Sequence, residues 1–249
     1  MPDDPSARGT LEAGMSVRIA QDPGWVEPFI EHQGEKRGFW LRKPRAVGEK
    51  LLIVREGFAI PAPLRDRIPI FLDFRSAFGT GGHGTTEGCL LAMEEFIRGG
   101  ERVLDVGTGT GILAIAGHKL GAGYVTAVDI DRGACGETRK NLALNGITGG
   151  VVVVEGGIRS AAVRYDVVVA NLRTHVLAGI MEDMVNRLTP GGAAILSGIL
   201  ERELHPFLSL LESYPLEPPE IRRIHGWMTL VSRKQRERCV DPPSGRFPA

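Results

Sequence analysis

The sequence predicts an α/β protein with a doubly wound, mostly parallel sheet of the Rossmann-like type. From about Thr85 onward, strand-like and helix-like segments alternate along the chain. The strand-like segments are continuous apolar runs; Val151–Glu155, for example, is four valines followed by an acid. Such runs between amphipathic helices are typical of strands that helices cover on both faces. A glycine-rich turn at residues 107–111, between a predicted strand and a predicted helix, indicates the same fold.

The alternating part of the chain predicts the following elements in order. We expect helices over residues 86–97, 112–120, 132–144, 176–188 and 201–213. We expect strands over residues 102–106, 124–129, 151–155, 166–170, 193–197 and 227–232. The run Thr189-Pro190-Gly191-Gly192 is a strong helix-stop signal and ends the fourth of these helices.

A small β-rich lead-in is predicted ahead of this domain, over residues 15–75. Its β-type runs at 38–42, 50–54 and 68–71 are separated by Pro and Gly. The α/β domain itself is predicted over residues 76–234. Residues 1–14 and 235–249 are polar and rich in Pro and Gly, so we expect disordered tails there.

Composition excludes several classes of protein. The 30 basic and 30 acidic residues give a net charge of +0, which does not support direct nucleic-acid binding driven by charge. The three cysteines, Cys89, Cys135 and Cys239, show neither metal-ligand spacing nor a disulfide framework. No apolar run suits a membrane span or a signal peptide. We therefore expect a cytoplasmic protein with no metal and no membrane contact; the sequence carries no signal for an oligomeric state.

The pattern D-x-G-x-G-x-G at residues 105–111 is the first candidate binding motif. Gly107, Gly109 and Gly111 allow positive φ and a close approach of the backbone to a ligand. The free amides at the start of the following helix suit a carboxylate. Asp105, just before the loop, suits an ammonium group. The loop and Asp105 therefore offer partners for a carboxylate and for an ammonium group, the latter directly or through water.

A second acid, Asp129, ends the next predicted strand and can accept hydrogen bonds from both hydroxyls of a ribose. Ile130 is then expected beside an adenine, with Glu155 or the backbone of Gly156 near the adenine edge. Asp129 alone is also compatible with a helix N-cap, a role for which Asp131 competes. The loop, the preceding acid and the strand-end acid together predict a nucleotide-type site.

A nicotinamide dinucleotide is the rival ligand, because residues 109–114 match G-x-G-x-x-A. Against it, Asp105 would direct an acid toward a pyrophosphate, and Gly107 is an additional glycine. No Tyr-Lys or His-Asp pair is evident for hydride transfer. A non-catalytic binding module is the third interpretation, if the residues described next are structural.

Residues 77–87 form a second glycine-rich loop, with small hydroxyl residues around His83. Thr85 or Thr86 can cap the helix that follows, and His83 is either an ordinary loop histidine or a proton acceptor. Asn171 ends the fourth predicted strand. It is either a turn residue or a polar group directed at an incoming nucleophile.

These segments resemble the bacterial PrmA family, the methyltransferases of large-subunit ribosomal protein eleven. Residues 77–86 are similar to the F-G-T-G-x-H-x-T-T signature of that family. The family's D-x-G-x-G-x-G, I-D-I-D, N-I-L and S-G-I-L segments match residues 105–111, 129–131, 171–172 and 197–200. The similarity covers roughly residues 22–234.

The resemblance implies a class I methyltransferase fold with S-adenosyl-L-methionine as cofactor, and methyl transfer to a lysine or α-amine of a protein. Cofactor contacts in the family fall on positions that match Thr86, Gly107, Asp129 and Asn171, and we add Phe78 from the signature. The catalytic candidates are Asn171, Thr86 and His83. A small-molecule N- or O-methyltransferase is the alternative.

The sequence departs from the family pattern in three places. Gly84 stands where the family usually has Pro, and Arg173-Thr174-His175 is bulkier than usual. Family members also carry a separate N-terminal substrate-recognition domain, joined to the methyltransferase domain by a linker. Here we expect only the linker region, from about Asp22, without the recognition domain. We therefore expect weak or partial methylation of ribosomal protein eleven.

Overall fold

The computed structural model describes residues 17–19, 43–73, 79 and 81–236. The predicted strand at 38–42, the predicted tail at 1–14 and residues 237–249 lie outside this part. Gln235, assigned from the sequence to the C-terminal tail, donates from its backbone and its side chain to the carbonyls of Pro215 and Leu216.

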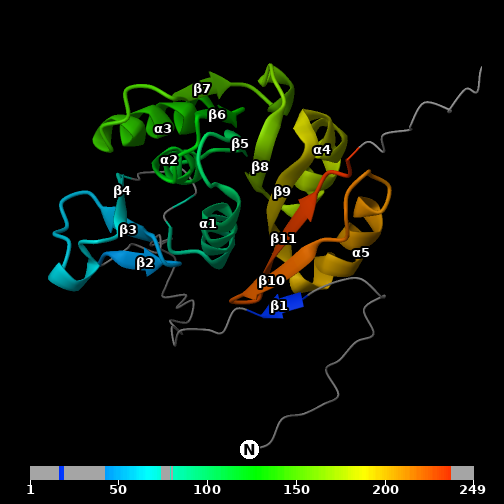
Figure 1. Ribbon diagram of the computed structural model, residues 1–249, viewed down its shortest axis with the longest axis horizontal. Helices are drawn as coiled ribbons and strands as arrows, with labels where there is room; N and C mark the ends of the chain where they lie inside the picture. The colour runs from blue at the N-terminus through cyan, green and yellow to red at the C-terminus, as the bar shows by residue number, and fades with distance from the viewer. Residues whose placement is uncertain (1–16, 20–42, 74–78, 80, 237–249) are drawn as a thin grey trace, which may run out of the picture.

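An eight-stranded sheet forms the centre of the molecule, in the order β1-β10-β11-β9-β8-β5-β6-β7 (Figure 1). Its strands are β1 (Val17–Ile19), β5 (Arg102–Val106), β6 (Tyr124–Asp129), β7 (Val151–Glu155), β8 (Tyr165–Asn171), β9 (Leu188–Leu200), β10 (Glu220–Ile224) and β11 (Trp227–Arg233). Strands β5 to β9 are parallel to one another, whereas β11 is antiparallel to both β9 and β10. The predicted doubly wound, mostly parallel sheet is confirmed.

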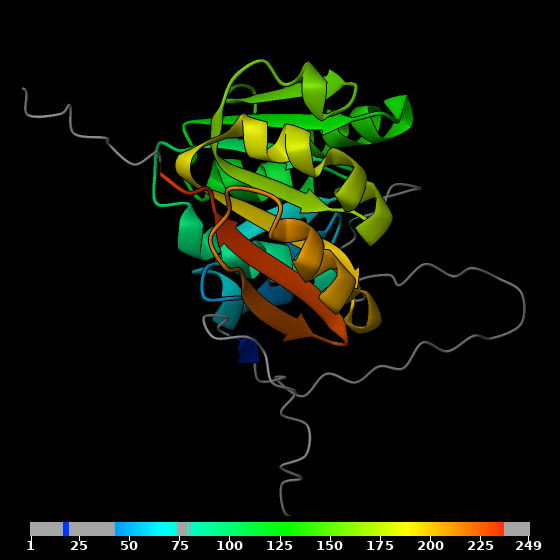
Figure 2. The ribbon, with the colours of Figure 1, turned by 90° about the vertical axis from the view of Figure 1, so that its right-hand side faces the viewer.

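Helices cover both faces of this sheet, because its central strands are apolar on both sides. The helices are α1 (Gly84–Phe96), α2 (Ile112–Lys119), α3 (Arg132–Leu144), α4 (Thr174–Arg187) and α5 (Glu201–Leu211). One buried cluster joins α1 and α2 to the sheet, and a second joins α4 and α5 to the opposite face. Figure 2 shows α4 and α5 lying over the face turned toward the viewer.

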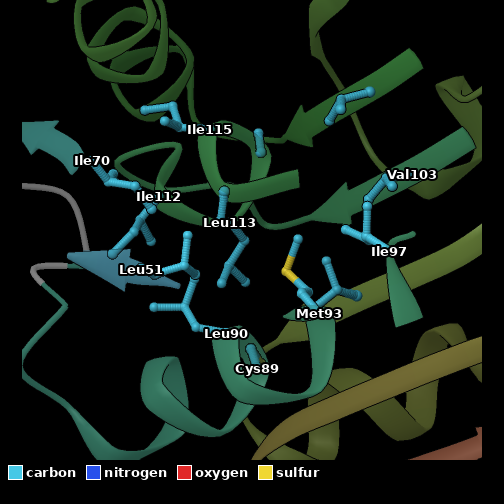
Figure 3. Close-up of a cluster of buried hydrophobic side chains, with 14 of the residues drawn as sticks. Leu51, Ile70, Cys89, Leu90, Met93, Ile97, Val103, Ile112, Leu113 and Ile115 are labelled. Atoms are coloured by element: carbon cyan, nitrogen blue, oxygen red, sulfur yellow. The ribbon is translucent and has the colours of Figure 1, made fainter. Parts of the chain in front are cut away.

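The lead-in forms a separate three-stranded sheet of β2 (Arg45–Val47), β3 (Leu51–Arg55) and β4 (Ile68–Leu72). Its apolar side chains belong to the same buried cluster as α1 and α2: Figure 3 shows Leu51 and Ile70 beside Leu90 and Ile112. Polar contacts add to this packing. The carboxylate of Glu94 in α1 accepts the amides of residues 49, 50 and 51 at 3.0–3.1 Å.

Several element boundaries agree with the sequence prediction, and others differ for identifiable reasons. The strands at 102–106, 124–129 and 151–155 and the helix at 132–144 have the predicted bounds. The run 189–192 ends α4 as predicted, but β9 begins directly at Leu188 and passes through it, so the predicted strand at 193–197 is too short. Strand β10 was not predicted because it is polar. Its Arg222 is only 5% exposed and pairs with Glu95 and Glu220.

Gly88 brings α1 against β11, and this contact generates a prediction. A Cβ at Gly88 would lie 2.1 Å from Thr229 Oγ1, whereas a Cβ at the exposed helical Gly136 of α3 would meet nothing within 4 Å. We expect Gly88→Ala to lower the free energy of unfolding by about 1–3 kcal/mol through overpacking. Gly136→Ala should raise it by about 0.5–1 kcal/mol. Urea denaturation of both variants measures this, and equal effects would contradict the close approach of α1 to β11.

Candidate cofactor and acceptor site

The glycine-rich loop between β5 and α2 adopts a backbone that only glycine tolerates well. Gly107, Gly109 and Gly111 have φ of 74°, 56° and 83°. A Cβ at Gly111 would also lie 2.8 Å from the methyl group of Thr138. Gly111 is the N-cap residue of α2 and offers no side chain to cap it. The helix therefore presents its amino end to the space above the loop.

Asp105 lies fully buried beneath this loop. Its Oδ2 accepts the hydroxyl of Thr108 at 2.7 Å and the amide of Ala114 at 3.1 Å. Its Oδ1 is buried and has no hydrogen-bond partner within the described part of the chain. Burial raises the pKa of this carboxyl to about 7, against the lowering effect of the two donors. A cation placed at Oδ1 would stabilise the charged form.

Asp129 holds the same loop from the end of β6. Its Oδ2 accepts the amide of Gly109 at 3.0 Å, and its Oδ1 accepts the amide of Asp131 at 2.9 Å. Asp131, and not Asp129, is the N-cap of α3, because it accepts the amide of Gly133 at 2.7 Å. Each Asp129 oxygen has a second lone pair, which leaves the half-buried carboxylate able to accept further hydrogen bonds.

A large apolar side chain lies directly beyond Asp129. Ile130 is 83% exposed, which is unusual for so large an apolar side chain next to a polar site. Glu155 is also exposed and stands opposite Asp129 in the pairing of β6 with β7. The amide of Gly156 donates to the carbonyl of Asp129 at 2.8 Å. These residues, predicted around an adenine, thus lie together at the carboxyl edge of the sheet.

Two of the catalytic candidates are in contact. The side-chain amide of Asn171, at the end of β8, donates to the hydroxyl of Thr86 in α1 at 3.3 Å. Thr86 is fully buried and Asn171 is half-buried. The structure therefore joins the second glycine-rich loop to the fourth parallel strand, which are 85 positions apart in sequence.

His83 caps α1, so the predicted cap at Thr85 or Thr86 is wrong. The helix begins at Gly84, earlier than expected, and Nδ1 of His83 accepts the amide of Thr85 at 3.4 Å and lies 2.8 Å from its hydroxyl. The imidazole packs against Trp227 with ring centroids 4.8 Å apart. Burial, followed by the nearby charge of His225, lowers the pKa of His83. The ring is therefore neutral at neutral pH, and the capping bond assigns its proton to Nε2.

Residues outside the predicted set also hold this loop. Arg45 of β2 pairs with Glu87 of α1 and donates to the carbonyl of Gly81 at 3.3 Å. His225, in the turn between β10 and β11, places Nε2 3.8 Å from the Glu87 carboxylate. No sequence pattern connects Arg45 with Glu87, because the lead-in meets α1 only in the folded chain. Phe78, also predicted to contact the cofactor, lies outside the described residues.

A cleft lies away from these residues. It has a volume of about 550 Å³ and opens at the opposite, amino edge of the sheet, where Asp166, Gly191 and Arg233 line it. Its acids Glu95 and Glu220 pair with Arg222. Within residues 43–73 and 81–236, no three His, Cys, Asp or Glu side chains are grouped to bind a metal, and no helix could span a membrane.

The strand order, together with a glycine loop and a strand-end acid at its carboxyl edge, defines the class I methyltransferase fold. The family model described as Ribosomal protein L11 methyltransferase (PrmA) matches residues 35–235. The chain therefore belongs to the PrmA family, as its motifs predicted.

Individual relatives agree with this family. A ribosomal protein L11 methyltransferase of Pelobacter propionicus is 40% identical over 197 residues, which cover 77% of this chain and 63% of the relative. One from Symbiobacterium thermophilum is 36% identical, covering 86% and 70%. The crystal structure of a ribosomal protein L11 methylase from Lactobacillus delbrueckii subsp. bulgaricus superposes with a TM-score of 0.73 at 30% identity, covering 78% of this chain and 99% of that one. The chain thus spans about two thirds of the length of the two curated relatives.

The buried carboxyl of Asp105 generates a prediction on pH. Its pKa is raised in the folded protein from an ordinary 3.8 to about 7. Its contribution to stability is therefore fully present below about pH 4 and is lost as the pH rises toward about 7, because the unfolded chain loses this proton first. We expect the free energy of unfolding of ligand-free wild type, relative to Asp105→Asn, to fall over this range by at most about 1.4 kcal/mol per pH unit. Urea denaturation at a series of pH values measures both proteins. Free energies of unfolding that change in parallel with pH in wild type and Asp105→Asn would contradict the raised pKa.

Proposed function

We propose that this chain is an S-adenosyl-L-methionine-dependent methyltransferase that methylates an amine of a protein. The observation that carries the proposal is the hydrogen bond between the amide of Gly109 and the carboxylate of Asp129, which sets a glycine loop and a ribose-type acid side by side. Membership of the PrmA family supports the same function. Nicotinamide dinucleotides fit less well, because fully buried Asp105 places an acid beneath the loop.

The residues present suit this cofactor. We assign the ribose hydroxyls to Asp129, the adenine face to exposed Ile130, and the adenine edge to Glu155 and Gly156. The unpartnered Oδ1 of Asp105 suits the ammonium group, directly or through water. The methionine carboxylate is assigned to the loop, whose members in the predicted set are Gly107, Gly109 and Gly111, and to the amino end of α2. Phe78, Thr86 and Asn171 complete the set. When bound, the cofactor supplies a methyl group already activated on a sulfonium.

The protein must then orient a neutral amine. A free lysine has a pKa of about 10.4 and an α-amine of about 8, so the acceptor ammonium has to release a proton to the solvent before the methyl group is transferred. Because Nδ2 of Asn171 donates to Thr86, its Oδ1 is the atom left to accept an N–H of the acceptor. Positioning of this kind is the main contribution that a protein makes to such a transfer.

His83 has a different role in this scheme. Its Nδ1 is engaged in capping α1, and the neutral ring carries its proton on Nε2. In this tautomer neither nitrogen is suited to receive the proton of the amine. We therefore propose that His83 positions the start of α1, and with it Thr86, and is not the proton acceptor.

The identity of the acceptor is the finer part of the proposal. The relatives are named as methyltransferases of ribosomal protein L11, so a protein amine is the favoured acceptor and the cytoplasm the expected compartment. A small molecule is the alternative acceptor, since Asn171 and Thr86 require only an N–H or O–H group.

The first prediction from the proposed function concerns the cofactor. We expect calorimetry to show binding of S-adenosylhomocysteine and none of NAD. Asp129→Ala should weaken the binding by about 1–3 kcal/mol, the scale of hydrogen bonds to a charged group. The matched control is Asp131→Ala, which removes the cap of α3 and lowers stability by about 1 kcal/mol but leaves the affinity unchanged. Affinity for NAD alone, or equal affinities of the two variants, would contradict the assignment.

The second prediction concerns Asn171. We expect Asn171→Ala to slow methyl transfer about 100-fold, because its hydrogen bonds matter most in the transition state. The dissociation constant of S-adenosylhomocysteine should change less than about threefold. Single-turnover kinetics and calorimetry on the same preparation separate the two effects. Equal losses in rate and affinity would make Asn171 a cofactor-shaping residue only.

The third prediction identifies the acceptor. Purified enzyme with isotope-labelled cofactor in a cell extract should transfer label to lysine or an N-terminal amine of a protein, as mass spectrometry of the products would show. Isolated ribosomal protein L11 is the first candidate to compare with the extract. Label found only in small molecules would exclude a protein acceptor while leaving the methyltransferase assignment intact.

A further inference from the structure

The glycine-rich loop at residues 107–111, the cofactor loop, contains Thr110, a buried residue to which the proposed methyl transfer assigns no role. Its side chain is 0% exposed and points away from solvent. Its hydroxyl donates to the carbonyl of Gly79 at 2.7 Å, and its own carbonyl accepts the side-chain amide of Asn141 at 2.9 Å. Gly79 belongs to the second glycine-rich loop, so one residue connects the two loops of the site.

Asn141 extends this connection to the end of β4. It is fully buried in α3, and its Oδ1 accepts the amide of Asp73 at 2.9 Å. Asp73 directly follows β4, and Gly79 precedes His83 and the start of α1. Thr110 is therefore linked directly to Gly79, and through Asn141 to Asp73.

The contact at Gly79 is close enough to require glycine. With φ of 112°, a Cβ at this position would lie 2.6 Å from the hydroxyl of Thr110. The two bonds made by Thr110 are both buried. Breaking a buried hydrogen bond leaves a polar group without water or partner, which makes the connection stiff.

We propose that Thr110 is a positioning residue. Through its hydrogen bond to Gly79, it fixes the position of the second glycine-rich loop relative to the cofactor loop. The inference rests on the proposed function and assigns Thr110 a role separate from cofactor binding itself. When a ligand binds residues 107–111 and restricts their remaining motion, the hydrogen bond from the hydroxyl of Thr110 restricts the motion of Gly79 as well. Because Gly79 shortly precedes His83, the cap residue of α1, the position of Gly79 also affects the start of α1 and Thr86. Displacements of about 1 Å at such a point are enough to slow a transfer about 100-fold.

Thr138 provides a matched control for this role. It is also fully buried, and its hydroxyl donates to the carbonyl of Gly109 in the same loop at 2.9 Å. Its methyl group lies beside Gly111, and within the described part of the chain its hydroxyl makes no hydrogen bond to residue 79. Thr110→Val and Thr138→Val therefore each remove one buried hydroxyl that holds the loop at residues 107–111, but only Thr110→Val removes a hydrogen bond to Gly79.

The experiment compares wild type, both valine variants and Thr110→Ser by hydrogen–deuterium exchange, with and without saturating S-adenosylhomocysteine. In wild type, the ligand should slow exchange in peptides spanning residues 79–86. In Thr110→Val, the ligand-induced protection factor of these peptides should be at least about tenfold smaller than in wild type. The dissociation constant of S-adenosylhomocysteine should change less than about threefold. Thr138→Val should bind several-fold more weakly but keep the protection at saturation, and Thr110→Ser should restore it.

Two results would overturn the inference alone: wild-type protection in Thr110→Val, or a loss of affinity in Thr110→Val equal to that in Thr138→Val. Rates of methyl transfer to isolated ribosomal protein L11 add a second readout, in which Thr110→Val lowers kcat and leaves the KM for cofactor unchanged. Wild-type protein that does not bind S-adenosylhomocysteine would instead overturn the proposed function, and this inference with it.

Discussion

The hydrogen bond from the amide of Gly109 to the carboxylate of Asp129 is the contact on which the site depends. A loop with positive-φ glycines at three alternate positions has little stiffness of its own, because glycine carries the largest conformational entropy. Asp129 supplies a fixed partner from the neighbouring strand, and Asp105 supplies a second from below. The loop is thus held open toward the carboxyl edge of the sheet before any ligand arrives. Such preorganisation lowers the entropy that binding would otherwise cost.

Helix α3 supports this arrangement with polar side chains on its buried face. Thr138 and Asn141 donate to the carbonyls of Gly109 and Thr110, and Asn145, the half-buried C-cap residue of the same helix, exchanges two hydrogen bonds with Phe71 of β4. Buried polar groups are stabilising only when they are paired, and the buried side-chain atoms of these three residues all have partners. The same helix therefore anchors both the loop and the small sheet. This explains how the lead-in becomes part of one packed body with α1 and α2.

Sequence reasoning located the main strands and the loop because both depend on local signals. The valine-rich strands are apolar on both faces, and the positions of Gly107, Gly109 and Gly111 follow from backbone conformation alone. Strand β10 was missed, since Arg222 is buried only by pairing with acids from other segments. The cap at His83 was missed as well, because histidine is an uncommon cap and the helix starts two residues earlier than the apolar pattern.

The site was predictable in its parts but not in its connections. Asp105 and Asp129 were predicted as site residues from their spacing, whereas only the family resemblance assigned Thr86 to the cofactor, and its contact with Asn171 was not predicted. The links from Thr110 to Gly79 and from Arg45 to Glu87 had no sequence signal, because they join segments that meet only through the tertiary fold.

The central claim is that Asp129 and the glycine loop form the cofactor site. A crystal structure of the protein with S-adenosylhomocysteine tests it most directly. The account predicts the ribose hydroxyls within hydrogen-bonding distance of the Asp129 carboxylate and the adenine against Ile130. A ligand seated elsewhere, such as in the cleft at the amino edge lined by Asp166 and Arg233, would contradict it.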